Sequence, residues 1–549
     1  MRRGTKSKAI YLSLMLVIII LMFIPSCSSA PSATTAPTTS AATTSAPTTS
    51  KTTAPATPTT TAAPTGDKYG GTLKTSLDSG LVGSLGYMPE LQNAAGVPLK
   101  AVIERLLILK MDGTTQPELA TSWKVADDRK SITINLRKNV KFHDGSDFNA
   151  DVVKWNLDLQ IKAKKSDVAN WTSVDIIDPY TIRIGLTTYT NTLFSGLGKL
   201  SITGMTSKAA FDKNGIDWAR ANPIGTGPFM FVEYQRDAKL TLKRNPNYWD
   251  TGKPYLDGIV MSVIPDDTVR RLSFEKGDII GYSPTAPSIA KEFEKSGKYN
   301  LVLRTSGPRV LAPDSMNPKS PWADIRVRFA ASYALDRELL ATALGSGHST
   351  PPYQIMQSQK DVVISNLIPT KYNPDKAKQL LLEAGYPSGF KTTLTGRPVI
   401  ITADQVSAVA AMLTKVGIDA SIDTVTAAKY DSMRLGGTWS GVLAESMLVQ
   451  ANKNDTFITY FTGMQWQYVK RPLGFQEALN ASLSKLEIDT ASIKAMIQIL
   501  YDDMTVIPFY EEDTASFENK GFHQDYKYTD YNGVDSPRYA DVWLDKSLR

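Results

Sequence analysis

Residues 67–549 combine the hydrophobic periods of strands and of helices. Apolar and polar residues alternate over 132–136 and again over 182–186, so both stretches predict half-buried strands. Between them, Asn149 can cap a helix that begins at Ala150. A further helix is expected over 324–344, starting at Asp324 with Phe329, Tyr333 and Leu340 turned inward.

Residues 373–424 carry the sharpest start and stop signals. Asn373 is placed to cap a helix whose first position is Pro374 and which ends at Gly385. Thr402 and Gln405 have the spacing of a capping box, and the helix that they open ends near residue 417. Alternation at 418–422 then indicates a strand, so 390–424 is predicted to be a βαβ unit and the body an α/β fold.

The amino terminus has the pattern of an export signal. Four basic residues, Arg2, Arg3, Lys6 and Lys8, precede an apolar run over 9–24. That run is slightly short for the ~20 residues that span a bilayer comfortably. We therefore predict a signal peptide over 1–26. Removing it lowers the formal charge from +7 to +3, because the four basic residues and no acid are lost, so the basic excess does not indicate a nucleic-acid-binding face.

The signal ends at Ile24-Pro-Ser-Cys27, and Cys27 is the only cysteine in the chain. The stretch resembles the processing site of bacterial lipoproteins, although Pro25 stands where a small residue is usual. The resemblance implies a lipidated Cys27 and an extracytoplasmic protein anchored to the bacterial cell membrane. Cleavage without lipidation and an uncleaved anchor are the alternatives.

Residues 28–66 consist almost wholly of Ala, Pro, Ser and Thr, with Lys51 as the one charge. Such a segment buries too little apolar surface to offset the entropy of ordering it. We expect 27–66 to be a lipidated cysteine followed by a disordered linker, a tether that could also carry glycans.

Candidate catalytic and metal chemistry is sparse. One cysteine excludes a disulfide framework and any cysteine-based zinc or iron–sulfur site. His143, His348 and His523 have no metal-ligand spacing, and Gly345-Ser-Gly-His348 is typical of a turn. HExxH, P-loop, GxSxG and GxGxxG motifs are absent from the sequence. We predict neither a metal nor a cofactor, and no enzyme.

Six stretches, in order, carry a family resemblance. The longest runs from Pro117-Glu-Leu-Ala-Thr-Ser-Trp123 to Lys141-Phe-His-Asp-Gly145. The others are Tyr69-Gly-Gly-Thr-Leu73, Pro223-Ile-Gly-Thr-Gly-Pro-Phe229, Arg244-Asn-Pro-Asn-Tyr-Trp249, Asp324 to Arg337, and Tyr372 to Phe390. Together they resemble the family 5 extracellular solute-binding proteins, the peptide- and nickel-binding group of ABC importers. The long stretch is a structural signature of that family, so His143 is interpreted as structural.

The resemblance implies a periplasmic-binding-protein-like fold of two hinged lobes with an extra inserted domain. Lobe I would take 67–85, 220–312 and 506–549, the inserted domain 86–219, and lobe II 313–505. The chain crossings near 304–314 and 504–510 would form the hinge. The implied function is that of a monomeric substrate-binding subunit, which closes on a solute and delivers it to a membrane permease with its ATPase. A ligand sensor or chaperone without transport is the alternative.

The expected ligand site departs from the peptide-binding pattern. Trp439 stands at the place of a family tryptophan, while Val442 falls where the aspartate that pairs with a peptide's amino group is expected. A buried ammonium without a countercharge is costly, so ordinary peptides would need Glu445 as a substitute. By loop position and residue type, four further pocket residues are predicted: Tyr87, Met88, Tyr353 and Trp466. The sequence leaves the identity of the solute open.

Overall fold

The computed structural model describes residues 66–110, 112–305, 307–397, 401–437, 439–463, 465–524, 527–529 and 535–549. The predicted signal peptide, Cys27 and the linker up to residue 65 lie outside these ranges. The described residues, from 66 onward, belong to one compact unit. Across the described ranges, we find no helix long and apolar enough to cross a membrane.

A mixed sheet of order β1-β10-β9-β8 forms the first core, in which β1 pairs in parallel with β10. A smaller sheet, β11-β18-β12, packs on α6 and α7 around Phe274, Phe293 and Phe517. Their elements are β1 Thr72–Leu77, β8 Phe229–Gln235, β9 Lys239–Arg244, β10 Gly258–Val263, α6 Asp267–Lys276, β11 Gly281–Tyr282, α7 Pro287–Ser296, β12 Tyr299–Thr305 and β18 Asp513–Asn519. Short carboxy-terminal elements are β19 Phe522–Gln524, β20 Lys527–Thr529, β21 Asp535–Pro537, η4 Tyr539–Asp541, β22 Val542–Leu544 and η5 Lys546–Leu548.

An antiparallel sheet of order β4-β5-β7-β6 forms the second core, with α2 packed against it. Its strands β5 and β7 confirm the alternation predicted over 132–136 and 182–186, and Asn149 caps α2 as predicted. The elements of this region are η1 Met88–Glu90, α1 Asn93–Leu99, β2 Leu107–Leu109, β3 Thr115–Pro117, β4 Ala120–Val125, β5 Ser131–Leu136, α2 Ala150–Lys162, η2 Ser166–Val168, β6 Trp171–Asp178, β7 Thr181–Leu186, α3 Leu193–Gly198, α4 Leu200–Thr203 and α5 Lys208–Ala221.

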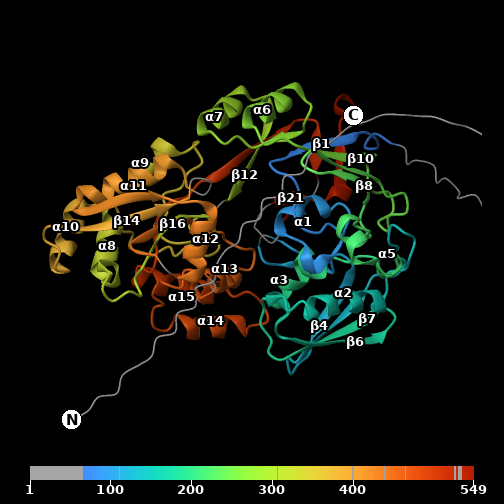
Figure 1. Ribbon diagram of the computed structural model, residues 1–549, viewed down its shortest axis with the longest axis horizontal. Helices are drawn as coiled ribbons and strands as arrows, with labels where there is room; N and C mark the ends of the chain where they lie inside the picture. Colours follow the sequence, from blue (N-terminus) through green and yellow to red (C-terminus); the bar gives the residue numbers. More distant parts are fainter. Residues whose placement is uncertain are drawn as a thin grey trace, which may run out of the picture. The chain divides into compact units, whose positions relative to one another are not determined.

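The third core is a five-stranded sheet of order β15-β14-β16-β13-β17 with helices on both faces (Figure 1). Helices α8 to α11 bury one face and α12 to α15 bury the other. Its elements are β13 Arg309–Pro313, η3 Pro321–Ala323, α8 Ile325–Ala334, α9 Arg337–Leu344, α10 Pro374–Glu383, β14 Phe390–Gly396, α11 Ala403–Lys415, β15 Ile418–Thr424, α12 Ala427–Gly436, β16 Val442–Ser446, α13 Lys453–Phe461, α14 Phe475–Leu483, α15 Thr490–Asp502 and β17 Ile507–Tyr510.

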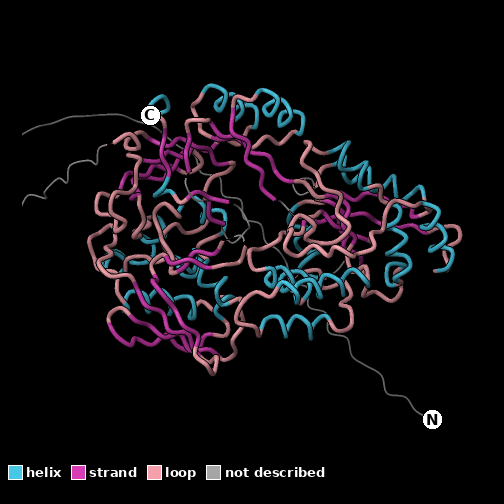
Figure 2. The backbone as a smooth tube through the Cα atoms, turned by 180° about the vertical axis from the view of Figure 1, so that it is seen from behind, coloured by secondary structure: helices cyan, strands magenta, loops and turns pink. Residues whose placement is uncertain are grey.

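The chain passes twice between the small sheet and the five-stranded sheet. Strand β12 pairs with β18 in the first, and β13 pairs with β17 in the second, so the passages are 305–309 and 510–513. Figure 2 shows the backbone from behind, with the strands of the sheets in magenta and the helices that pack around them in cyan. Both passages lie at or close to the predicted crossings, while the domain limits stay predictions.

Residues 373–424 fold as the sequence indicates. Asn373 caps α10, Thr402 and Gln405 form the capping box of α11, and β14 pairs in parallel with β15 as a βαβ unit. The single helix expected over 324–344 is wrong, because the chain forms α8 and α9 with a break between them. Leu335 is extended at the break, and the Asp336 carboxylate accepts the backbone N–H of Leu339, which opens a second helix.

Two of the family-like stretches, 223–229 and 244–249, meet at one buried carboxyl group, Glu104. It accepts hydrogen bonds from the Thr226 hydroxyl at 2.8 Å, the Tyr248 hydroxyl at 2.6 Å and the Trp249 indole at 2.8 Å. A Cβ on Gly225 would come within 2.0 Å of the Val102 carbonyl oxygen, so only glycine allows this approach. These two stretches therefore pack together around Glu104.

The remaining signature residues also have structural contacts. His143 donates from Nε2 to the Gly227 carbonyl at 2.9 Å, and burial lowers its pKa to about 4, so it is neutral. Arg328 and Arg337 are buried, and each donates to backbone carbonyls of α8 or η3 and of the 503–508 segment. The structural interpretation of the long signature agrees with these contacts.

Candidate functional site

A row of charged side chains lies at the end of the five-stranded sheet where its parallel strands have their carboxyl ends. We call this end the sheet edge. Strands β14, β15, β16 and β17 are mutually parallel, and β13 runs against them. Arg397 follows β14, Glu445 is next to last in β16, Arg309 opens β13, and Glu511 follows β17. In open α/β sheets, ligands bind outside the carboxyl ends of the strands, and this is that edge.

Glu445 is buried, with 3% of its surface exposed, beside two guanidinium groups. Its Oε1 accepts the Ser446 backbone N–H, while Oε2 has no hydrogen-bond partner within 3.5 Å among the described residues; the Tyr430 hydroxyl also interacts with the carboxyl group. Burial raises the pKa of Glu445 to about 7, against the opposing charges of Arg434 and Arg397. Both arginines also pair with Asp431, at 2.9 and 3.5 Å. The carboxyl group can therefore accept a hydrogen bond from a ligand.

A second buried acid, Glu511, lies where the chain leaves β17. Its Oε1 accepts the Ser358 hydroxyl at 2.5 Å, and Oε2 has no partner within the described ranges. Burial raises the pKa of Glu511 to about 7. Arg309 stacks its guanidinium 5.8 Å from the centre of the Tyr510 ring, whose hydroxyl donates to Glu512. Acidic and basic groups therefore alternate along the passages.

A cavity of about 300 Å³ lies on the other side of the passages, next to the small sheet. Arg304, the next-to-last residue of β12, lines it, together with Ser283 and Ser516. Its Nη1 donates to the Ser516 hydroxyl at 3.5 Å, and its buried Nε has no partner in the part of the chain that the structure describes. Arg304 and Arg309 thus lie on either side of the first passage.

The predicted aromatic site residues of the second half of the chain lie inside the protein. Trp439 is 5% exposed and Trp466 is fully buried, and both belong to the cluster beneath α12 to α15. Trp439 precedes β16, so it lies toward the amino end of that strand, whereas Glu445 lies toward the carboxyl end. Val442 packs in the core on the opposite face. Trp439, Trp466 and Glu445 border the same side of the sheet.

The other three predicted residues are not brought to the sheet edge by any contact of the described chain. Met88 is buried in the core of the first sheet, and Tyr87 stacks on Phe211 with ring centres 6.0 Å apart. Tyr353 lies under the Arg337 guanidinium, and its hydroxyl donates to Glu338 at 3.4 Å. All six residues stay predictions as ligand contacts.

Four charged residues at or beside the sheet edge were not predicted from the sequence: Arg397, Arg434, Arg309 and Glu511. A usable signal did exist in the apolar run 442–444, which is typical of a fully buried strand. The carboxyl end of such a strand, where ligands bind, lies near residue 445 and not at Trp439. The arginines gave no signal of their own, because single basic residues usually belong to solvated surface.

The model of the bacterial extracellular solute-binding proteins, family 5 (middle region), matches residues 114–468, more than half of the chain. The chain belongs to this family. The resemblance drawn from the six stretches is thereby confirmed.

Among curated proteins, the heme-binding protein A of Haemophilus influenzae is 33% identical over 327 residues, which are 54% of this chain and 59% of that protein. The glutathione-binding protein GsiB of Salmonella typhimurium is 31% identical over 339 residues, 60% of this chain and 64% of GsiB. The chain thus spans less than two thirds of the length of either relative. Both relatives are binding proteins, which supports the prediction that this family 5 chain is not an enzyme.

Among solved structures, the periplasmic binding protein DppA of Helicobacter pylori in complex with the peptide STSA superimposes with a TM-score of 0.71. The match is 22% identical and covers 87% of this chain and 99% of DppA. The predicted two-lobe, periplasmic-binding-protein-like fold is confirmed at this level.

Proposed function

We propose that this chain is the substrate-binding subunit of an ABC importer. It captures a small, peptide-like solute between its two lobes and delivers it to a membrane permease with an ATPase. It acts as a monomer outside the cytoplasm, anchored to the membrane through a lipidated Cys27. Support for a peptide-like solute comes from relatives named for glutathione and for a bound peptide.

The row of charges at the sheet edge carries this proposal. Peptide-like solutes have ammonium and carboxylate groups, and the edge offers a carboxyl group, Glu445, next to the guanidinium of Arg397. Charge-assisted hydrogen bonds of this kind are short and strong in sites shielded from water. The Glu445 carboxylate would supply to a ligand ammonium the countercharge that the aspartate provides in peptide-binding members.

The proposal is tested on the full-length protein, extracted with detergent from membranes of its own host. Native mass spectrometry identifies the retained solute, and calorimetry measures its affinity. Glu445→Gln is expected to raise the Kd at least about tenfold, because the charged partner is lost. The control is Glu383→Gln, an exposed acid on α10 that should leave the Kd unchanged. Equal affinity of both variants and the parent would exclude the sheet edge.

The anchor has its own test. Replacing Cys27 by alanine removes the thiol that is acylated, so the protein should leave the membrane fraction or remain unprocessed. Cell fractionation and the migration of the mature protein report the outcome. A Cys27→Ala protein that fractionates and migrates like the parent would show that this cysteine is not the attachment point.

A further inference from the structure

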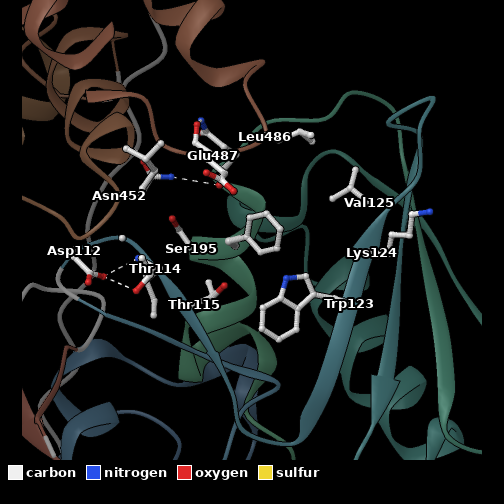
Figure 3. A pocket seen from close by; sticks show the side chains of 15 residues that line it. Asp112, Thr114, Thr115, Trp123, Lys124, Val125, Ser195, Asn452, Leu486 and Glu487 are labelled. Carbon is white, nitrogen blue, oxygen red and sulfur yellow. Dashed lines mark hydrogen bonds between the residues drawn. The ribbon is translucent and has the colours of Figure 1, made fainter. Parts of the chain in front are cut away.

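A cavity of about 600 Å³ lies apart from the sheet edge, between β4 with α3 and the segments around α13 and α14 (Figure 3). Trp123 and Phe194 line one wall, while Asn452 and Glu487 line the other. Asp112, on the turn before β3, closes one end. No residue of the sheet edge described above lines this cavity, so it is a distinct space.

Hydrogen bonds hold the two walls together. The Asn191 side chain is 2% exposed and donates to the Ser482 carbonyl at 2.9 Å. Its Oδ1 accepts the Asn454 amide at 3.1 Å, and its backbone N–H donates to the Leu483 carbonyl. An occupant of the cavity would therefore contact two walls that these hydrogen bonds join.

One buried polar group in the wall lacks a close hydrogen-bond partner. The Ser195 hydroxyl is buried and lines the cavity; it interacts with the buried carboxyl group of Asp455 but has no hydrogen-bond partner within 3.5 Å among the described residues. Figure 3 shows Ser195 and the Trp123 indole turned toward the same space. Buried hydroxyls normally have close hydrogen-bond partners, and this one can still accept a hydrogen bond from a ligand or water in the cavity.

The lining favours a cation. The Trp123 and Phe194 rings lie 6.4 Å apart, centre to centre, and aromatic faces attract cations. The acids Asp112 and Glu487 add negative charge. Burial raises the pKa of Asp112, but the hydrogen bonds from Thr114 outweigh it and hold that pKa below its ordinary value, so the carboxylate is ionised.

Nearby lysines only partly cancel this charge. Lys124 also lines the cavity, but it follows Trp123 on β4 and its side chain extends to the other side of the strand (Figure 3). Lys110 and Lys453 act on Asp112 from outside the cavity, and Lys453 pairs with Asp361 at 3.1 Å. The aromatic wall and Glu487 are therefore left as a site for positive charge.

We propose that this cavity is a second ligand site and that it takes a small organic ammonium ion. The aromatic wall contacts the apolar substituents of the ion, and the Glu487 carboxylate neutralises its charge. The Ser195 hydroxyl, on α3, is placed to accept a hydrogen bond from an N–H or polarised C–H group.

The test uses tetramethylammonium chloride on the full chain, with sodium chloride keeping the ionic strength constant. The indole N–H resonance of Trp123, assigned by its loss in Trp123→Phe, is expected to shift in a saturable way. Glu487→Gln should raise the Kd of tetramethylammonium at least about threefold. Glu477→Gln is the control, because this acid is exposed on α14 and does not line the cavity.

Three outcomes would overturn the proposal. They are no saturable shift in the parent, an equal shift with the neutral 2,2-dimethylpropan-1-ol, and an unchanged Kd in Glu487→Gln. A Trp123→Leu variant that still binds its solute at the sheet edge, but no longer binds tetramethylammonium, would support the second site. That readout also separates this site from the proposed importer function, because each ligand is followed on its own.

Discussion

Replacing Glu104 by alanine is expected to lower the free energy of unfolding by about 4 kcal/mol. The substitution leaves three buried donors, on Thr226, Tyr248 and Trp249, without their acceptor. Each unsatisfied donor costs about 1–3 kcal/mol, and removing the side chain adds a cavity. The substitution also removes the cost of burying the carboxyl group, whose pKa is raised to about 7 by burial, and this offsets part of the loss. Urea unfolding at pH 7, followed by tryptophan fluorescence, measures the change.

The matched control is Glu104→Gln, which keeps one oxygen acceptor and nearly the same volume. It should cost less than half as much as the alanine variant, because the amide oxygen still accepts from at least one donor. If the free energies of unfolding of both variants lie within about 1 kcal/mol of the parent's, Glu104 does not hold the stretches 223–229 and 244–249 together.

Local signals were sufficient for many elements of the fold. Asn149, Asn373 and Thr402 each cap the helix that their sequence position predicts, since a cap depends on residues only three apart. The break after α8 was missed for a related reason. Asp336 is itself a cap, but the apolar positions on either side continue the helical period and hide it.

The candidate site depends on topology that no local pattern contains. Arg397, Glu445 and Glu511 are far apart in sequence and meet because β14, β16 and β17 end at one edge. Family resemblance directed attention to Trp439, which precedes β16 by three residues and lies in the core cluster. The bounds of β16 decide which residues reach the sheet edge: Glu445 lies at its carboxyl end, and Trp439 lies at its amino end.

Burial of two acids near the passages has a consequence for stability. Glu445 and Glu511 both have pKa values raised from 4.5 to about 7, with burial as the first cause. Between these two pH values the unfolded chain has lost the proton, whereas the folded chain keeps it. Unfolding therefore releases protons, and rising pH favours the unfolded state. The stability is fully present below about pH 4.5 and is lost as the pH rises through about 7.

Glu511→Gln should remove the part of this pH-dependent loss of stability that comes from ionisation of Glu511. A pKa shift of that size corresponds to about 3 kcal/mol. Between pH 4 and pH 8, the free energy of unfolding of the variant should therefore rise by about that much relative to that of the parent. The amide still accepts the Ser358 hydroxyl, which keeps the local structure. Urea unfolding across this pH range measures the difference, with the exposed Glu477→Gln as the control. Parallel pH profiles for Glu511→Gln and the parent would mean that the Glu511 carboxyl ionises with an ordinary pKa and that the passages are open to water.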